Sequence, residues 1–93
     1  MKISVKYLGH LRDDLGTEES YDLFGDSNPH RLGEILAEMG QRKGESFARK
    51  IYEEDGRFNP HITLILDGRA ILNDQVMVQD GSSLLFIPFV DGG

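Results

Sequence analysis

The groups best suited to chemistry stand at the end of the chain, where an apolar run leads into two glycines. Phe89, Val90 and Asp91 are followed by Gly92 and Gly93, and we expect Gly93 to carry the free α-carboxylate. Glycine has no Cβ, so a Gly-Gly tip adopts almost any backbone conformation and can enter a channel too narrow for side chains. The alternative is a frayed terminus that ends in glycine by chance. The sequence predicts a reactive carboxylate only if the rest of the chain is consistent with one.

Other patterns that could carry chemistry are weak. The chain has no cysteine, which removes thiol nucleophiles, disulfides and thiolate metal sites. His10, His30 and His61 are too far apart in sequence for paired metal ligands on one helix, so no metal site is predicted. The sequence contains neither of the glycine-rich spacings typical of phosphate-binding loops, G-x-G-x-x-G and G-x-x-x-x-G-K-[ST]. We therefore expect no bound cofactor, and an autonomous enzyme is the least favoured class.

Length, charge and hydropathy restrict the number of domains, the type of partner and the location of the protein. Ninety-three residues without an internal repeat predict a single domain, 1–93. The net charge of -6 and the scatter of basic residues argue against nucleic acid and favour an electropositive protein partner. The longest apolar stretch, 84–90, is too short to cross a bilayer, and residues 1–11 lack a signal-peptide core. We predict a soluble, cytoplasmic protein that does not bind membranes.

The first half of the chain predicts a hairpin followed by a helix. Apolar residues alternate with polar ones over 3–7, and a second strand is predicted over 19–24, with a turn of helix near 11–15 between them. Asn28 and Pro29 have the types that cap and begin a helix. Gly40 is the residue type that commonly ends a helix, so the helix is predicted to stop there. The helix would present one apolar stripe to a sheet, formed by Leu32, Ile35, Leu36 and Met39.

The second half predicts three further strand segments after a polar insertion. Residues 41–60 are polar and rich in glycine, with a short helix expected around Phe47 and Ile51. A strand over 61–66 meets a turn at Asp67 and Gly68, and 70–72 continues on the other side. Residues 76–78 lead to a last strand over 84–87, which Pro88 ends because proline cannot donate a ladder hydrogen bond. The predicted order is β-β-α-β-β with a short helical insertion.

The last strand also predicts an exposed apolar surface. If Leu84 and Phe86 face the helix, the side chains between them must face outward. Contiguous exposed apolar area commonly marks a partner site. The alternative is that residues 41–60 fold back and cover this face. The predicted docking surface consists of Leu8, Ile65, Leu85 and Ile87.

Three segments of the chain carry a family resemblance: 11–16 (LRDDLG), 61–69 (HITLILDGR) and 80–93 (DGSSLLFIPFVDGG). They resemble the ubiquitin-like (β-grasp) sulfur carriers of the MoaD and ThiS type, above all the small subunit of molybdopterin synthase, and the related small archaeal modifier proteins. Two positions depart from the family pattern: Ser82 replaces a frequent aspartate and Phe89 a second proline. The resemblance implies an α+β, ubiquitin-like β-grasp fold. Its mixed sheet would have four to five strands, with one main helix across one face and a flexible tail over 89–93.

The resemblance also implies a function for the C-terminal glycines. A ubiquitin-activating-type enzyme would use ATP and Mg²⁺ to adenylate Gly93, and a thiocarboxylate formed there would donate sulfur inside the large subunit of molybdopterin synthase, in molybdenum cofactor biosynthesis. Gly92 would help Gly93 to reach these active sites. The chain would then be a carrier, or a non-catalytic subunit, and not an enzyme. Partner contacts are expected at Leu8, Ile65, Leu85, Ile87, Pro88, Phe89, Val90 and Asp91.

Two other functions fit the same residues. A ubiquitin-like modifier would pass the activated Gly93 to lysines of target proteins as an isopeptide. A plain β-grasp interaction module would bind through its sheet and keep an inert tail. The sequence separates these alternatives poorly, and it does not distinguish a molybdenum from a tungsten pathway.

Overall fold

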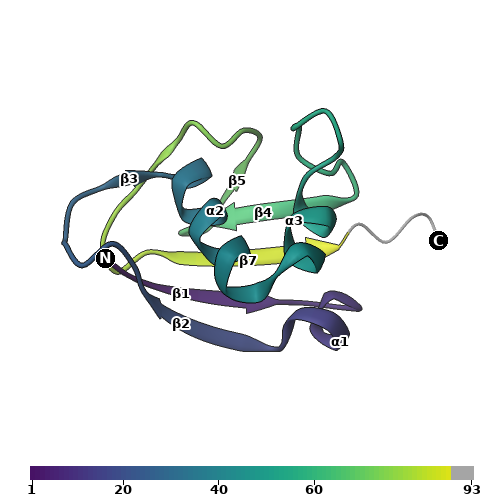
Figure 1. The fold of residues 1–93 in the computed structure, drawn as a ribbon, viewed down its shortest axis with the longest axis horizontal. Helices are drawn as coiled ribbons and strands as arrows, with labels where there is room; N and C mark the ends of the chain where they lie inside the picture. The colour runs from purple at the N-terminus through teal and green to yellow at the C-terminus, as the bar shows by residue number, and fades with distance from the viewer. Residues whose placement is uncertain (89–93) are drawn as a thin grey trace.

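The computed structural model describes residues 1–88 and consists of a sheet with helices across one face (Figure 1). The sheet has five strands in the order β2-β1-β7-β4-β5. These strands are β1 (Lys2–Tyr7), β2 (Glu18–Asp22), β4 (Ile62–Leu66), β5 (Arg69–Ile71) and β7 (Ser83–Pro88). The other elements are α1 (Leu11–Leu15), α2 (Leu32–Lys43), α3 (Glu45–Ile51) and a two-stranded ribbon of β3 (His30–Arg31) with β6 (Met77–Val78).

The central strand, β7, makes the sheet mixed. It runs parallel to β1 and antiparallel to β4, whereas the β1–β2 and β4–β5 pairs are antiparallel. The first and last strands of the chain therefore lie side by side at the middle of the sheet. This is the predicted β-grasp architecture. Within residues 1–88, no helix is long and apolar enough to span a membrane.

The core lies between the sheet and the helices. The predicted stripe on α2 is fully buried, and α3 adds Phe47 and Ile51 to the same layer. Phe86 of β7 stacks on Tyr7 with ring centroids 5.2 Å apart and meets Phe47 edge-on at 6.1 Å. The insertion therefore covers the helix side of the sheet. The alternative in which residues 41–60 cover the outer face is wrong for α3, because Phe47 contacts an inward-facing residue.

Both predicted ends of the main helix were wrong, for physical reasons. Residues 28 and 29 do not begin it, because the next two residues pair with β6 as strand β3. The helix begins at Leu32, whose N–H donates to the Val76 carbonyl at 2.8 Å, and the next N–H donates to the Asp74 carbonyl at 2.9 Å. Backbone carbonyls of a distant loop thus replace a side-chain cap.

The helix also continues past Gly40. It ends at Lys43, and Gly44 takes a left-handed φ of 96° while its N–H donates to the Gly40 carbonyl at 2.8 Å. Gly44 is also the residue before α3, so the two helices join at one glycine. The positive φ explains why the chain has glycine at the corner.

Candidate functional site

The outer face of the sheet brings together the side chains predicted to form a docking surface. Leu85 lies opposite Lys6 of β1 on one side and Ile65 of β4 on the other. The Leu8 N–H donates to the Phe86 carbonyl at 3.0 Å, so Leu8 lies beside the end of β7. These side chains remain partly exposed, whereas their neighbours Leu84 and Phe86 are buried. We call Leu8, Ile65, Leu85 and Ile87 the outer apolar patch.

Polar groups border the outer apolar patch. Ile87 lies opposite the exposed Thr63, and Lys6 lies opposite Glu18 of the edge strand β2. Further along the same face, the Ser4 and Ser83 hydroxyls are 2.9 Å apart. A shallow hollow of ≈ 350 Å³ lies between these groups and the patch. An apolar centre with a polar rim is the composition of a protein-binding surface.

Pro88 holds the end of β7 and offers little surface. It lies opposite Ile62 and is buried, although we predicted it to contact a partner. The other residues predicted at this end lie outside the described residues: Phe89, Val90, Asp91, Gly92 and Gly93. Their partner-binding and chemical roles stay predictions. What the structure gives is the starting point of this segment, at the edge of the outer apolar patch.

A charged cluster that the sequence reasoning missed surrounds His30. One ring nitrogen lies 3.0 Å from Asp26 and the other 3.1 Å from Glu34, while the ring stacks on Phe24 at 4.0 Å. The hydrogen bond to Asp26, followed by that to Glu34, raises the pKa of His30. The hydrogen bond with His30 lowers the pKa of each carboxyl. Asp26 and Glu34 each stand four residues from His30, and this spacing is the sequence signal that could have predicted the cluster.

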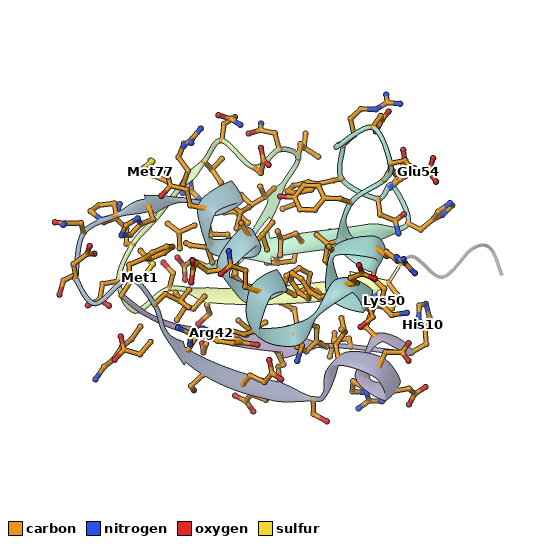
Figure 2. All side chains as sticks on the ribbon, in the orientation of Figure 1. Met1, His10, Arg42, Lys50, Glu54 and Met77 are labelled. Carbon is orange, nitrogen blue, oxygen red and sulfur yellow. The ribbon has the colours of Figure 1, made fainter. Side chains whose placement is uncertain are left out.

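Each ring nitrogen of His30 in this cluster faces a carboxylate of its own. No group of three or more metal-ligating side chains occurs among residues 1–88. His10 and Lys50 lie on the side of the molecule where β7 ends (Figure 2). There the Lys50 ammonium lies 2.8 Å from the Asp14 carboxylate and lowers its pKa. Those charges are paired and tie α1 to α3.

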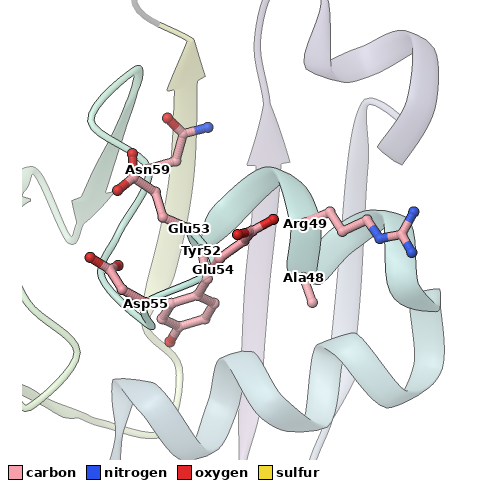
Figure 3. Close-up of a pocket in the computed structure, with 7 residues that line it drawn as sticks. All are labelled: Ala48, Arg49, Tyr52, Glu53, Glu54, Asp55 and Asn59. Carbon is pink, nitrogen blue, oxygen red and sulfur yellow. The ribbon is translucent and has the colours of Figure 1, made fainter.

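An open hollow of ≈ 1070 Å³ lies over α3 and the loop after it (Figure 3). Its lining consists of Ala48, Arg49, Tyr52, Glu53, Glu54, Asp55 and Asn59. Of its three carboxylates, that of Asp55 accepts a hydrogen bond from Arg57 at 2.7 Å, which lowers its pKa. The lining offers no activated nucleophile. It gives this end of the body an acidic surface.

Comparison with solved structures shows the same fold in several other small proteins. SAMP1 of Haloferax volcanii is 24% identical over 100% of both chains, with a TM-score of 0.71. The putative molybdopterin converting factor, subunit 1, of Pyrococcus furiosus is 24% identical over 97% of this chain and 99% of that one (TM-score 0.70). A chain of the BexX/CysO complex of Amycolatopsis orientalis is 24% identical over 98% of this chain and 99% of that one (TM-score 0.72).

These likenesses show the ubiquitin-like β-grasp fold that the sequence predicted. They include a molybdopterin converting factor subunit and a small archaeal modifier protein, the two groups that the sequence resembles. No protein-family model matches the chain, and no curated protein matches it by sequence.

Proposed function

We propose that the protein is a sulfur carrier of the kind found in molybdopterin synthase, and that the carboxylate of Gly93 carries the sulfur. The observation that carries the proposal is the position of the outer apolar patch beside the end of β7. Because β7 leads directly into residues 89–93, a partner bound to the patch would receive the two glycines next to its own surface. The fold shared with a molybdopterin converting factor subunit supports this assignment.

The chemistry begins with a carboxylate that is a poor acyl donor. A carboxylate oxygen of Gly93 attacks the α-phosphorus of ATP on the activating enzyme, which forms an acyl-adenylate and releases pyrophosphate. The terminal sulfur of a persulfide then attacks the acyl carbon, and AMP leaves. A second thiol attacks the outer sulfur of the resulting acyl disulfide, so that a disulfide forms and the thiocarboxylate is released. ATP and Mg²⁺ belong to the activating enzyme in this scheme.

The body of the protein would serve two partners in the cytoplasm. A ubiquitin-activating-type enzyme would load Gly93, and the large subunit of molybdopterin synthase would receive the sulfur. Both would bind the outer apolar patch, because it lies on the sheet face that the helices leave open. The net charge of -6 favours partners with basic rims.

A second candidate is a protein modifier joined through Gly93 to target lysines, and the likeness to small archaeal modifier proteins favours it. Both candidates require the same adenylation. Among the chain's own lysines, Lys43 would be a poor acceptor. Its ammonium donates to the Leu15 carbonyl at 2.7 Å and pairs with Glu19, and its side chain is only 14% exposed. Lys2 and Lys6 are exposed on the outer face.

The test is ATP–pyrophosphate exchange with the activating enzyme of the same organism. The full chain should support exchange, and a chain lacking Gly92 and Gly93 should support none. Both chains should melt at the same temperature, since the deletion leaves residues 1–88 intact. Equal exchange by the two chains would contradict the role of Gly93. Partner binding that persists without any exchange by the full chain would favour an interaction module with an inert tail.

A further inference from the structure

The connection between β1 and α1 crosses the end of β7 at a distance that only glycine permits. Gly9 has a φ of +58°, and a Cβ placed on it would lie 2.7 Å from Cγ of Pro88. Carbon atoms that are not bonded pack at about 3.5–4.0 Å. The Gly9 backbone therefore occupies space that no other residue could share with the Pro88 ring.

Pro88 has little freedom to move away from this contact. It is buried and lies opposite Ile62 of β4 on its other side. Its ring closes on its own backbone nitrogen, so a push on Cγ cannot be absorbed by a side-chain rotamer and is passed to the main chain. A residue other than proline at position 88 would lack the ring that joins the side chain rigidly to the main chain.

The connection that carries Gly9 is also anchored. The Arg12 N–H donates to the Gly9 carbonyl at 3.2 Å, and the Leu8 N–H binds the Phe86 carbonyl of β7 at 3.0 Å. Helix α1 buries Leu11 in the core, and its Asp14 pairs with Lys50 of α3 at 2.8 Å. Because the connection is held on both sides of Gly9, a new side chain there would displace Pro88 and leave Leu8 in place.

We infer that Gly9 is a positioning residue: by lacking a side chain it lets the Pro88 ring sit where the chain leaves the body in the direction that delivers Gly93 to the activating enzyme. This inference rests on the proposed function. It concerns the step after docking, because Gly9 and Pro88 are not part of the outer apolar patch.

The test is the Gly9→Ala variant in the same exchange assay, with kcat and KM for the carrier measured separately. A shift of Pro88 that is passed along the chain to Gly93 misplaces the reacting carboxylate. A misplacement of about 1 Å can cost about 100-fold in rate, so kcat should fall at least about tenfold. KM should stay unchanged because the patch is intact. The matched control is Gly25→Ala, which has a similar φ of +71° but open space around it and should leave kcat unchanged.

A double-mutant cycle with Pro88→Ala isolates the contact and also covers the case in which Gly9→Ala does not fold. Removing the ring should itself lower kcat. The double variant should then be no slower than Pro88→Ala alone, because the added methyl group meets nothing. Additive losses, an unchanged kcat in Gly9→Ala, or a raised KM with unchanged kcat would each overturn the positioning role. If the wild-type chain supports no exchange, the proposed function fails and this role fails with it.

Discussion

At the scale of single residues, the alternation along β7 separates core from surface. Leu84 and Phe86 are buried under the helices, while Leu85 and Ile87 face the open side of the sheet. If the outer face of β7 met only water, aliphatic side chains would be needed on its inner face alone. Within the outer apolar patch, Leu85 lies on the central strand β7, with Ile65 of β4 on one side and Lys6 of β1 on the other.

The Leu85→Glu variant should bind the activating enzyme at least about tenfold more weakly, since it places a charge at the centre of an apolar interface. Its melting temperature should stay within a few degrees of the wild type, because the side chain is outside the core. Calorimetric titration and thermal melts check the two parts.

Gln41→Glu is the matched control for charge, because Gln41 is exposed on α2 and away from the patch. It should bind like the wild type. Loss of the cooperative melt in Leu85→Glu would show that Leu85 belongs to the core, and equal weakening by both variants would point to net charge instead of the patch.

His30 is the other residue whose environment predicts a measurable effect. Its pKa is raised, so its stabilising contribution is complete below its unfolded pKa of about 6.5 and is lost as the pH rises through the higher folded value. The pKa values of Asp26 and Glu34 are lowered. Their contribution is therefore lost in acid, as the pH falls through those lowered values.

The His30→Gln variant should be less stable than the wild type at about pH 6, and this difference should shrink by about pH 9. Glutamine also loses the stacking on Phe24, but that loss does not change with pH. Urea unfolding of both chains at the two pH values measures the difference. A difference that is the same at both would mean that the charge on His30 does not stabilise the fold.

At the scale of elements, periodicity predicted which residues form helices and strands better than where those elements end. The stripe from Leu32 to Met39 identified α2, and Phe47 with Ile51 identified α3. The ends depended on distant residues: β3 exists because His30 pairs with Val78, and α2 begins where the loop at Val76 supplies a carbonyl. Local sequence carries no information about such partners.

Phe47 should be the main anchor of helix α3, because it is fully buried against Phe86. The Phe47→Ala change should lower the free energy of unfolding by about 3–5 kcal/mol, because it leaves a cavity in the core. Urea unfolding measures the loss, and Phe47→Leu should lose clearly less. A cost below about 1 kcal/mol for the alanine variant would mean that α3 does not help to hold the sheet.

At the scale of the whole molecule, the helices and the outer apolar patch lie on opposite faces of the sheet. The fold class and the residues of the patch were predicted from alternation and from the segments that resemble sulfur carriers. The packing of Pro88 under Gly9 was not, because it depends on the left-handed φ of Gly9 and on a contact between residues 79 positions apart in the chain. Both features lie at or beside the end of β7.

The central claim is that Gly93 carries sulfur, and intact mass spectrometry tests it most directly. The full chain and a chain lacking Gly92 and Gly93 would each be incubated with the activating enzyme, ATP and a persulfide donor. We predict a mass gain equal to the exchange of one oxygen for sulfur, in the full chain alone. Isopeptide adducts without that gain would indicate a modifier. An unchanged mass in a reaction where the enzyme is active would contradict the sulfur-carrier account.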